Sequence, residues 1–378
     1  MKVKHRLDQL RKLMGEHQLE NVFILNPDHQ FYLTGFKALT YSRPIILNIS
    51  LHQSSLVVPG LEEIHAKDVA EIDNIHVYYE HPIEKVSKKD HMEYIKEFLK
   101  GCSSGAKIGV DLNHTPGNII DLIQQNGFTF TDVGGFIEQM RYVKEDEEIQ
   151  LLQKAGELVN LAVEKSLESI KIGTTEMEID AVGNSAIFKE TAKNYPDATL
   201  DLFVMSPSGV KRSTMPHVFS NTRKIKSGDV IIHSRQVGLY GYRAELERTV
   251  IVGTPTSEQL KAFELAVEAQ RRAIDFIKPG VKASDVDRIA REVFVKAGLD
   301  KYAVHRTGHG IGISAHEKPF LRFDNHELII EEGMAFCIEP GIYIPNVGGF
   351  RHSDTVIVTS DGCKLITEYP YDVNDLLI

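Results

Sequence analysis

The pattern of apolar and polar positions is strongest in the first third of the chain. Residues 1 to 140 alternate helical patterns, such as LDQLRKLMGEHQL and HMEYIKEFLK, with short apolar runs such as NVFIL, PIILNI, SSLVVPG and KIGVD. Apolar residues that recur every three to four positions predict helices, and short apolar runs rich in Val and Ile predict strands. Alternation of the two predicts a layered α/β domain with largely parallel strand pairing.

A charge-dense stretch, EQMRYVKEDEEI, follows and leads into the long periodic run IQLLQKAGELVNLAVEKSLESI. Such a stretch is typical of a linker that enters the first helix of a new domain. We therefore expect an N-terminal α/β domain over residues 1–140 and a catalytic domain over residues 141–378.

The second domain contains a weak internal repeat. A helix ending in IKIG at residues 170–173 is followed by TTEMEIDAVGNSAIFKE, and a helix ending in IKPG at residues 277–280 is followed by VKASDVDRIAREVFVKAG. Each half is predicted to contain a helix, a glycine stop, a Ser/Thr cap, a second helix and then strands. The repeat predicts an α+β domain with an internal pseudo-twofold axis, whose two halves form a cleft at a shared sheet.

Composition and charge narrow the possible functions. The chain has 378 residues and a formal net charge of −10, without a concentrated block of Lys and Arg, which argues against nucleic-acid binding. No apolar run approaches the roughly 18 residues of a membrane span. The three cysteines, Cys102, Cys337 and Cys363, have neither even number nor paired spacing, as expected in a reducing compartment. We expect a cytoplasmic protein that binds neither nucleic acid nor membrane.

Polar residues occur where the local pattern calls for buried apolar ones. Glu339 lies in the apolar run FCIEPGIY, where a carboxylate is costly unless it meets a cation or hydrogen-bond donors. The other members of this set are His217, Glu245, Glu247, His309 and His316. A single histidine is more often a structural residue than a functional one, but the whole set, spread over both halves of the repeat, predicts an active site.

Two of these carboxylates lie on one predicted hairpin. Side chains alternate between the faces of a strand, so Glu245 and Glu247 share a face, as do Ser234 and Gln236 on the facing strand. The alternative is an exposed hairpin edge, with Arg243 and Arg248 forming surface salt bridges.

With these residues in place, the chain resembles the creatinase and Xaa-Pro peptidase superfamily, which has the pita-bread fold. The stretches that carry the resemblance are NPDHQFYLTGF, MPHVFSNTRKIKSGD, GYRAELERTVIVG, HRTGHGIGISAHEKP, GMAFCIEPGIYIP and GGFRHSDTVIVT. For the peptidases of this family, the resemblance implies a dinuclear metal site of two aspartates, one histidine and two glutamates. The matching positions here are Ser234, Glu245, His309, Glu339 and Ser353.

Two of these five positions are serines, and a neutral hydroxyl does not replace a carboxylate at a hard divalent cation. We therefore expect a creatinase-like, metal-independent hydrolase without a cofactor, which cleaves a C–N bond in a small amidino or amino-acid-like substrate. The resemblance to creatinase implies His217 as the proton shuttle, with Glu247 and Glu339 clamping a cationic or hydrogen-bond-donating group. His309 and His316 complete the predicted catalytic set. Three ligands suffice for one ion, so Glu245, His309 and Glu339 can still form a single-metal site.

Further residues are predicted to bind substrate. Tyr41 and Arg43 stand in an aromatic-x-Arg-Pro setting that resembles a creatinase segment reaching into a neighbouring subunit, which implies a homodimer. Arg43, Tyr41, Glu245 and Arg322 are the predicted substrate-binding residues. His352 lies one position from Ser353, on the opposite strand face, and should not substitute for a site histidine.

Two alternatives stay open. One is an Xaa-Pro dipeptidase or aminopeptidase-like metallopeptidase with a reduced, single metal site and a dipeptide-like substrate, which His316 favours because it resembles the peptidases' catalytic histidine. The other is a non-catalytic pita-bread binding protein. The number of titratable residues in buried settings argues against the latter.

Overall fold

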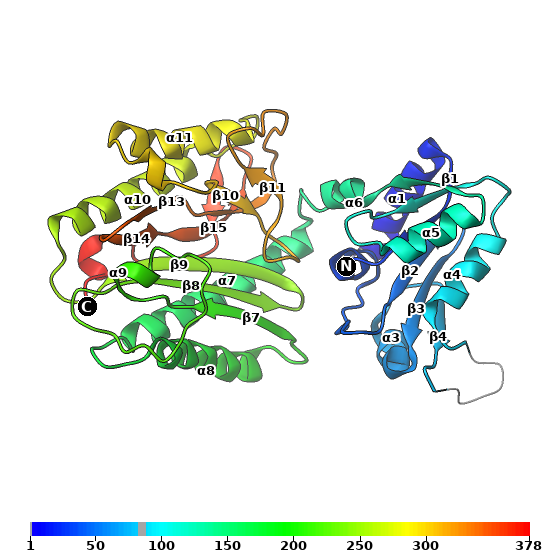
Figure 1. Cartoon of the computed structure of the whole chain (residues 1–378), viewed down its shortest axis with the longest axis horizontal. Coiled ribbons are helices and arrows are strands. Elements are labelled where there is room, and N and C mark those ends of the chain that lie inside the picture. Colours follow the sequence, from blue (N-terminus) through cyan, green and yellow to red (C-terminus); the bar gives the residue numbers. More distant parts are fainter. Residues whose placement is uncertain (1, 82–87) are drawn as a thin grey trace. The chain divides into compact units, whose positions relative to one another are not determined.

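The computed structural model describes residues 2–81 and 88–378. The chain forms two compact units, Met1–Arg141 and Tyr142–Ile378 (Figure 1). No helix in this described part of the chain has the length and apolar character that a membrane crossing needs.

The N-terminal unit is a mixed sheet with helices packed against it. Its six strands are ordered β4-β3-β2-β1-β5-β6, and three of the five neighbouring pairs, β3–β4, β1–β5 and β5–β6, are parallel. Its strands are β1 (Leu19–Ile24), β2 (Ile46–Ser50), β3 (Ser54–Pro59), β4 (Asn74–Tyr78), β5 (Lys107–Val110) and β6 (Thr129–Asp132). Its helices are α1 (Val3–His17), α2 (Pro27–Thr34), α3 (Glu63–Val69), α4 (His91–Lys100), α5 (Gly117–Gln125) and α6 (Gly134–Met140).

The stretch NPDHQFYLTG forms α2 for local reasons. The side chain of Asn26 accepts a hydrogen bond from the backbone N–H of Asp28, which caps the helix, and Pro27 occupies the first turn. Gly35 ends the helix at a φ of 73°, a conformation that glycine adopts at little cost.

The C-terminal unit is built on an eight-stranded sheet with the order β11-β10-β12-β15-β9-β8-β7, and β16 pairs with β15. Its strands are β7 (Leu200–Met205), β8 (Val230–Leu239), β9 (Tyr242–Ile251), β10 (Gly308–Gly310), β11 (Glu317–Leu321), β12 (Ala335–Ile338), β15 (Ser353–Val358) and β16 (Cys363–Leu365). A separate two-stranded sheet contains β13 (Gly341–Ile344) and β14 (Gly348–Arg351). The helices are α7 (Asp146–Glu168), α8 (Glu176–Asn194), α9 (Gly209–Arg212), α10 (Ser257–Phe276) and α11 (Ala283–Lys296).

The internal repeat appears as two helix pairs, α7–α8 and α10–α11, which Figure 1 shows on either side of the strands in that view. The glycines that end the repeated motifs, Gly173 and Gly280, have φ values of 93° and 89°. Thr175 forms a capping box with Glu178 at the start of α8. The second half differs, because no side chain caps α11.

The hairpin of β8 and β9 carries the two neighbouring glutamates. Its turn consists of Tyr240 and Gly241, which both have positive φ, as a two-residue turn matched to strand twist requires. Every residue of both strands is buried, and both lie inside the sheet. This excludes the exposed edge that was the alternative interpretation.

Candidate functional site

Three strands bring polar side chains into one row across the sheet. Glu247 on β9 is the register partner of Ser234 on β8 and of Ser353 on β15. Glu245, two residues earlier, is the partner of Gln236. We call Glu245, Glu247, His309, Glu339 and Arg351 the central cluster; all five are buried.

His309 is held between two strands by the glycines that flank it. A Cβ atom on Gly308 would lie 2.2 Å from the carbonyl oxygen of Cys337, which confirms that glycine is needed for close backbone approach. The Nδ1 atom of His309 is 2.9 Å from the carbonyl oxygen of Gly310. Because Nδ1 must donate to that carbonyl, Nε2 is left as an acceptor.

The free nitrogen of His309 faces two acids. Its Nε2 atom lies 3.5 Å from Oε1 of Glu339 and 4.0 Å from Oε2 of Glu245, and it has no hydrogen-bond partner in the described residues. Burial lowers the pKa of His309 and raises that of Glu339 well above its usual range. A buried lone pair directed at carboxylate oxygens fits a cation between them.

Glu245 is held by two neutral donors. Ser353 donates from Oγ to Oε1 of Glu245 at 2.7 Å, and Gln236 donates from Nε2 to Oε2 at 2.5 Å. Burial alone would raise the pKa of Glu245, but His309 and these hydrogen bonds lower it overall. Gln236 therefore has a role at the site, although no role was predicted for it from the sequence.

Arg351 contacts both Glu247 and Glu339, the two carboxylates that were predicted to hold a cationic or hydrogen-bond-donating group of the substrate. Its Nε and Nη2 atoms donate to the two carboxylate oxygens of Glu247 at 2.5 and 2.7 Å. Its Nε atom also lies 3.8 Å from Glu339, and its Nη1 atom donates to the hydroxyl of Tyr343 at 3.3 Å. Arg351 was not among the predicted site residues, although it lies two residues before Ser353 in the sequence.

Two further histidines are neutral imidazoles near the cluster. The ring of His316 stacks on that of His309 with centroids 3.8 Å apart, and partial burial, the neighbouring His309 and Arg306 lower the pKa of His316 to about 4. His217 lies in the loop before β8, where partial burial, Arg351 and Arg306 lower its pKa. Lowered pKa values keep both side chains neutral near pH 7, the form that a general base requires.

Arg306 is a second residue near the cluster that the sequence did not predict. Its guanidinium lies over the ring of Phe320, 4.1 Å from the centroid, and its Nη2 atom is 3.2 Å from Nδ1 of His316. Its Nε atom is buried without a hydrogen-bond partner in the described residues. Arg306 lies three residues before His309 in the stretch HRTGHG, and no pattern in the sequence marked it as functional.

The remaining candidates are not part of this cluster. Arg322 is exposed and forms a bidentate ion pair with Asp324. Arg43 donates to Glu80 at 2.8 Å, and Tyr41 is 88% exposed; both belong to the N-terminal unit, and their roles stay predictions. His352 packs edge-on against Phe263 of α10, with ring centroids 4.7 Å apart.

The described residues include two groups of three potential metal ligands whose ligand atoms lie within 4.8 Å of one another. One is Glu245, His309 and Cys337, and the other is Glu245, Glu247 and Glu339. Glu245 belongs to both groups. The site therefore offers ligands to a divalent ion. In addition to these two groups, Glu339 and Glu245 face the Nε2 atom of His309 at 3.5 and 4.0 Å.

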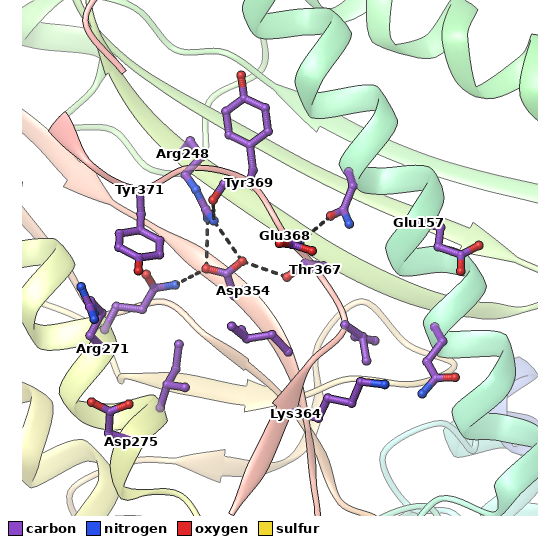
Figure 2. A pocket seen from close by; sticks show the side chains of 16 residues that line it. Glu157, Arg248, Arg271, Asp275, Asp354, Lys364, Thr367, Glu368, Tyr369 and Tyr371 are labelled. Atoms are coloured by element: carbon purple, nitrogen blue, oxygen red, sulfur yellow. Dashed lines mark hydrogen bonds and ion pairs between the residues drawn. The ribbon is translucent and has the colours of Figure 1, made fainter. Parts of the chain in front are cut away.

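A cavity of about 710 Å³ lies on the other face of the sheet (Figure 2). Arg248 and Asp354, which alternate with Glu247 and Ser353 along their strands, form an ion pair at its wall. Arg248 also donates from Nη1 to the carbonyl oxygens of Glu247 at 2.8 Å and Ser353 at 3.1 Å. This cavity is not the site, but its arginine fixes the two strands that carry it.

Comparison with known proteins identifies the class. Residues 150–360 match the model of metallopeptidase family M24, and residues 6–143 match the creatinase/prolidase N-terminal domain. The chain belongs to metallopeptidase family M24. It is a hydrolase of C–N bonds with the predicted fold, an α/β N-terminal domain followed by an α+β pita-bread domain.

Particular relatives resemble the chain over its whole length. It is 31% identical to an Xaa-Pro dipeptidase of Pyrococcus furiosus, covering 97% of this chain and 98% of the relative, and 32% identical to a putative dipeptidase, YkvY, of Bacillus subtilis, covering 98% and 99%. Among solved structures, the prolidase of Thermococcus sibiricus has a TM-score of 0.86 at 26% identity, covering 100% of both chains.

These findings correct two predictions. The prediction of a metal-independent, creatinase-like hydrolase is wrong, because the full-length relatives are Xaa-Pro dipeptidases. The prediction that the enzyme has no metal ligands and no cofactor is wrong as well, because the family is one of metallopeptidases and the cluster offers closely spaced ligands. The prediction gave most weight to the charge lost at Ser234 and Ser353. The structure adds the buried Nε2 atom of His309, which has no hydrogen-bond partner in the described residues.

Proposed function

We propose that this protein is an Xaa-Pro dipeptidase that holds one divalent metal ion with Glu245, His309 and Glu339. The observation that carries the proposal is the buried, unpartnered Nε2 atom of His309, which faces carboxylates of Glu339 and Glu245 at 3.5 and 4.0 Å. The likeness to Xaa-Pro dipeptidases along 97% of the chain supports the substrate class.

Each proposed ligand is oriented by a neighbour. The carbonyl of Gly310 fixes the tautomer of His309, and Ser353 and Gln236 fix the two oxygens of Glu245. When bound, the ion supplies Lewis-acid polarisation of the scissile carbonyl and an acidified water. A carboxylate, an imidazole and a second carboxylate form a ligand set with room for substrate.

His316 and His217 are proposed to handle protons. The nitrogen of an Xaa-Pro bond carries no hydrogen, so it must gain a proton to leave as the amine of proline. A neutral imidazole can take a proton from the attacking water and return it to that nitrogen. The lowered pKa values of His316 and His217 keep both imidazoles neutral.

Arg306 is proposed to bind the free carboxylate of the dipeptide. Its guanidinium contacts His316 and carries a buried Nε atom that has no partner in the part of the chain that the structure describes, so a carboxylate bound there lies beside the proposed proton carrier. Guanidinium groups match the planar geometry of carboxylates. This preference for a free carboxyl end distinguishes a dipeptidase from an aminopeptidase. Arg322 is retained as a weaker second candidate.

The remaining proposals concern assembly and location. We propose a homodimer in which the N-terminal unit contributes Tyr41 and Arg43 to the interface. The high exposure of Tyr41 and Leu39, which lie in one loop, supports this proposal.

The domain boundary is proposed near residue 140, between α6 and α7. A cytoplasmic location is proposed because the three cysteines are free.

The test is proline release from Ala-Pro. Protein freed of metal with a chelator and then desalted should be inactive, and addition of Mn²⁺ should restore hydrolysis. Ala-Pro amide, which lacks the free carboxylate, should be a poor substrate. Equal rates on the dipeptide and its amide, or no hydrolysis with any of Mn²⁺, Co²⁺ and Zn²⁺, would exclude the proposal.

A further inference from the structure

His316 lies at the end of an irregular segment, residues 311–316, which connects β10 to β11 and contains no helix or strand. The backbone groups of such a segment must find hydrogen-bond partners outside its own secondary structure. The position of the proposed proton carrier therefore depends on the residues that hold this segment.

The hairpin of β8 and β9 holds the segment by three hydrogen bonds to its carbonyl oxygens. Arg243 donates from its backbone N–H to Gly312 at 2.9 Å and from Nε to Ile313 at 3.2 Å. Gln236 donates from Nε2 to the carbonyl oxygen of Ala315 at 3.2 Å. The two hairpin residues thus fix the segment near its start and near its end.

The side-chain amide of Gln236 also binds the proposed metal ligand. Its Nε2 atom lies 2.5 Å from Oε2 of Glu245, its register partner across the hairpin. An amide nitrogen carries two hydrogens. Since Glu245 and the carbonyl of Ala315 are both acceptors, each hydrogen has one partner. One nitrogen atom of a side chain that is 2% exposed thereby joins Glu245 to the segment.

This orientation of the amide leaves its oxygen unsatisfied. Oε1 of Gln236 is buried and has no hydrogen-bond partner among the described residues, an arrangement that costs free energy. An apolar side chain would avoid this cost, and local costs of this kind are expected at functional sites. The geometry therefore favours a function for the two donated bonds.

The segment has one further anchor. The carboxylate of Glu317 accepts hydrogen bonds from the backbone N–H of Ser314 at 3.3 Å and from Nζ of Lys144 at 3.0 Å. Loss of the bond from Gln236 should therefore loosen the segment without releasing it.

The end of the segment determines where the imidazole lies. The ring of His316 stacks on that of His309, with centroids 3.8 Å apart, and Ala315 is the residue that precedes it. We propose that Gln236 is a positioning residue, which ties His316, through Ala315, to Glu245. The inference rests on the proposed function, which makes Glu245 a metal ligand and His316 a proton carrier.

The test compares the two donors to Glu245. Gln236→Met keeps the length of the side chain and removes its bonds to Glu245 and Ala315. Ser353→Ala is the matched control, because the Ser353 hydroxyl donates to Glu245 and not to the segment. Hydrogen–deuterium exchange of residues 311–317 is measured in the full-length, metal-free protein. Exchange should be roughly 2- to 10-fold faster in Gln236→Met, because the segment loses one hydrogen bond, and unchanged in Ser353→Ala.

Kinetics show whether Gln236 acts through His316. With saturating Mn²⁺, Gln236→Met should lower kcat for Ala-Pro by about 10-fold or more, as small misplacements of a catalytic group do, and change KM by less than about twofold. In a His316→Ala background the same substitution should lower kcat no further, because the effects of residues that act as a unit are not additive. Gln236→Asn, whose amide is one methylene shorter, should behave like Gln236→Met. Circular dichroism shows which variants are folded.

The outcomes separate this inference from the proposed function. Unchanged exchange in the folded Gln236 variants, or equally fast exchange in Ser353→Ala, would overturn the inference. So would a normal kcat, or a loss of kcat that persists in the His316→Ala background, because Gln236 would then act on Glu245 alone. Faster exchange in the Gln236 variants without proline release by the wild type would refute the dipeptidase proposal and leave the tie between Gln236 and the segment standing.

Discussion

Arg351 and Glu247 form a buried, bidentate ion pair across 104 residues of sequence, with donor–acceptor distances of 2.5 and 2.7 Å. The pair joins the end of β14 to the middle of β9 and closes one side of the central cluster. Buried charges are tolerated only when paired and hydrogen-bonded. The pair therefore contributes both to the stability of the fold and to the charge balance of the site.

Glu247→Gln should destabilise the fold strongly, because it leaves the buried guanidinium of Arg351 without its main partner. Breaking such a pair costs roughly 3–5 kcal/mol. Urea unfolding at pH 7 measures the loss in the free energy of unfolding. The double variant Glu247→Gln, Arg351→Met should lose less than the single one, because no charge is left unpaired. A single-variant loss below about 1 kcal/mol would mean that Arg351 is not held by Glu247.

Arg306→Met should weaken binding of Ala-Pro. Loss of a charge-assisted hydrogen bond is worth about 1.5–3 kcal/mol, which corresponds to a rise of roughly 10- to 100-fold in KM. Arg288→Met, on the exposed face of α11, is the matched control. If KM for the dipeptide and its amide change by the same factor, the carboxylate is bound elsewhere.

The same variant should move the pH profile. The positive charge of Arg306 contributes to the lowered pKa values of His217 and His316, so its removal raises them. The proposed activity needs both imidazoles neutral. As the pH is lowered, the variant should therefore lose activity at a higher pH than the wild type does. The acid limb of kcat/KM, measured between pH 4 and 8, checks this. If the acid limb does not move, a group other than His217 and His316 controls it.

His316→Ala should lower kcat by about 10²- to 10⁴-fold, the usual contribution of a general acid–base residue. KM should change little, because the ring stacks on His309 rather than holding the substrate carboxylate. The side chain is only partly covered and reaches the surface, so the melting temperature should stay close to that of the wild type. A normal kcat would remove His316 from the mechanism.

Acid should destabilise the protein through its buried histidines. His352 is fully buried, and burial and Arg248 hold its pKa well below 6.5. Below about pH 6.5 the unfolded chain therefore binds more protons than the folded one, and the free energy of unfolding falls as pH decreases. His352→Leu should flatten that dependence between pH 6.5 and 4. An unchanged slope in urea unfolding would show that His352 does not contribute.

Local pattern was enough to predict the two folds and the acidic face of the hairpin. The alternation that puts Glu245 and Glu247 on one face depends only on neighbouring residues, and the apolar setting of Glu339 marks it as a buried acid. Arg351, Gln236 and Arg306 were not predicted to act. Their contacts depend on strand register and loop packing over long sequence separations, as in the 104 residues between Glu247 and Arg351.

The prediction that the protein binds no metal was wrong for a related reason. The loss of charge at Ser234 and Ser353 was given more weight than the three ligands that remain, Glu245, His309 and Glu339. The structure shows what remains: a histidine nitrogen without a partner, two facing acids, and an internal cation that balances the third.

The most direct test of the account is the hydrolysis of Ala-Pro during stepwise addition of Mn²⁺ to metal-free enzyme. The account predicts that the rate rises linearly and reaches its plateau at one equivalent of Mn²⁺ per chain. A plateau at two equivalents, or full activity before any metal is added, would contradict a dipeptidase built on one ion held by Glu245, His309 and Glu339.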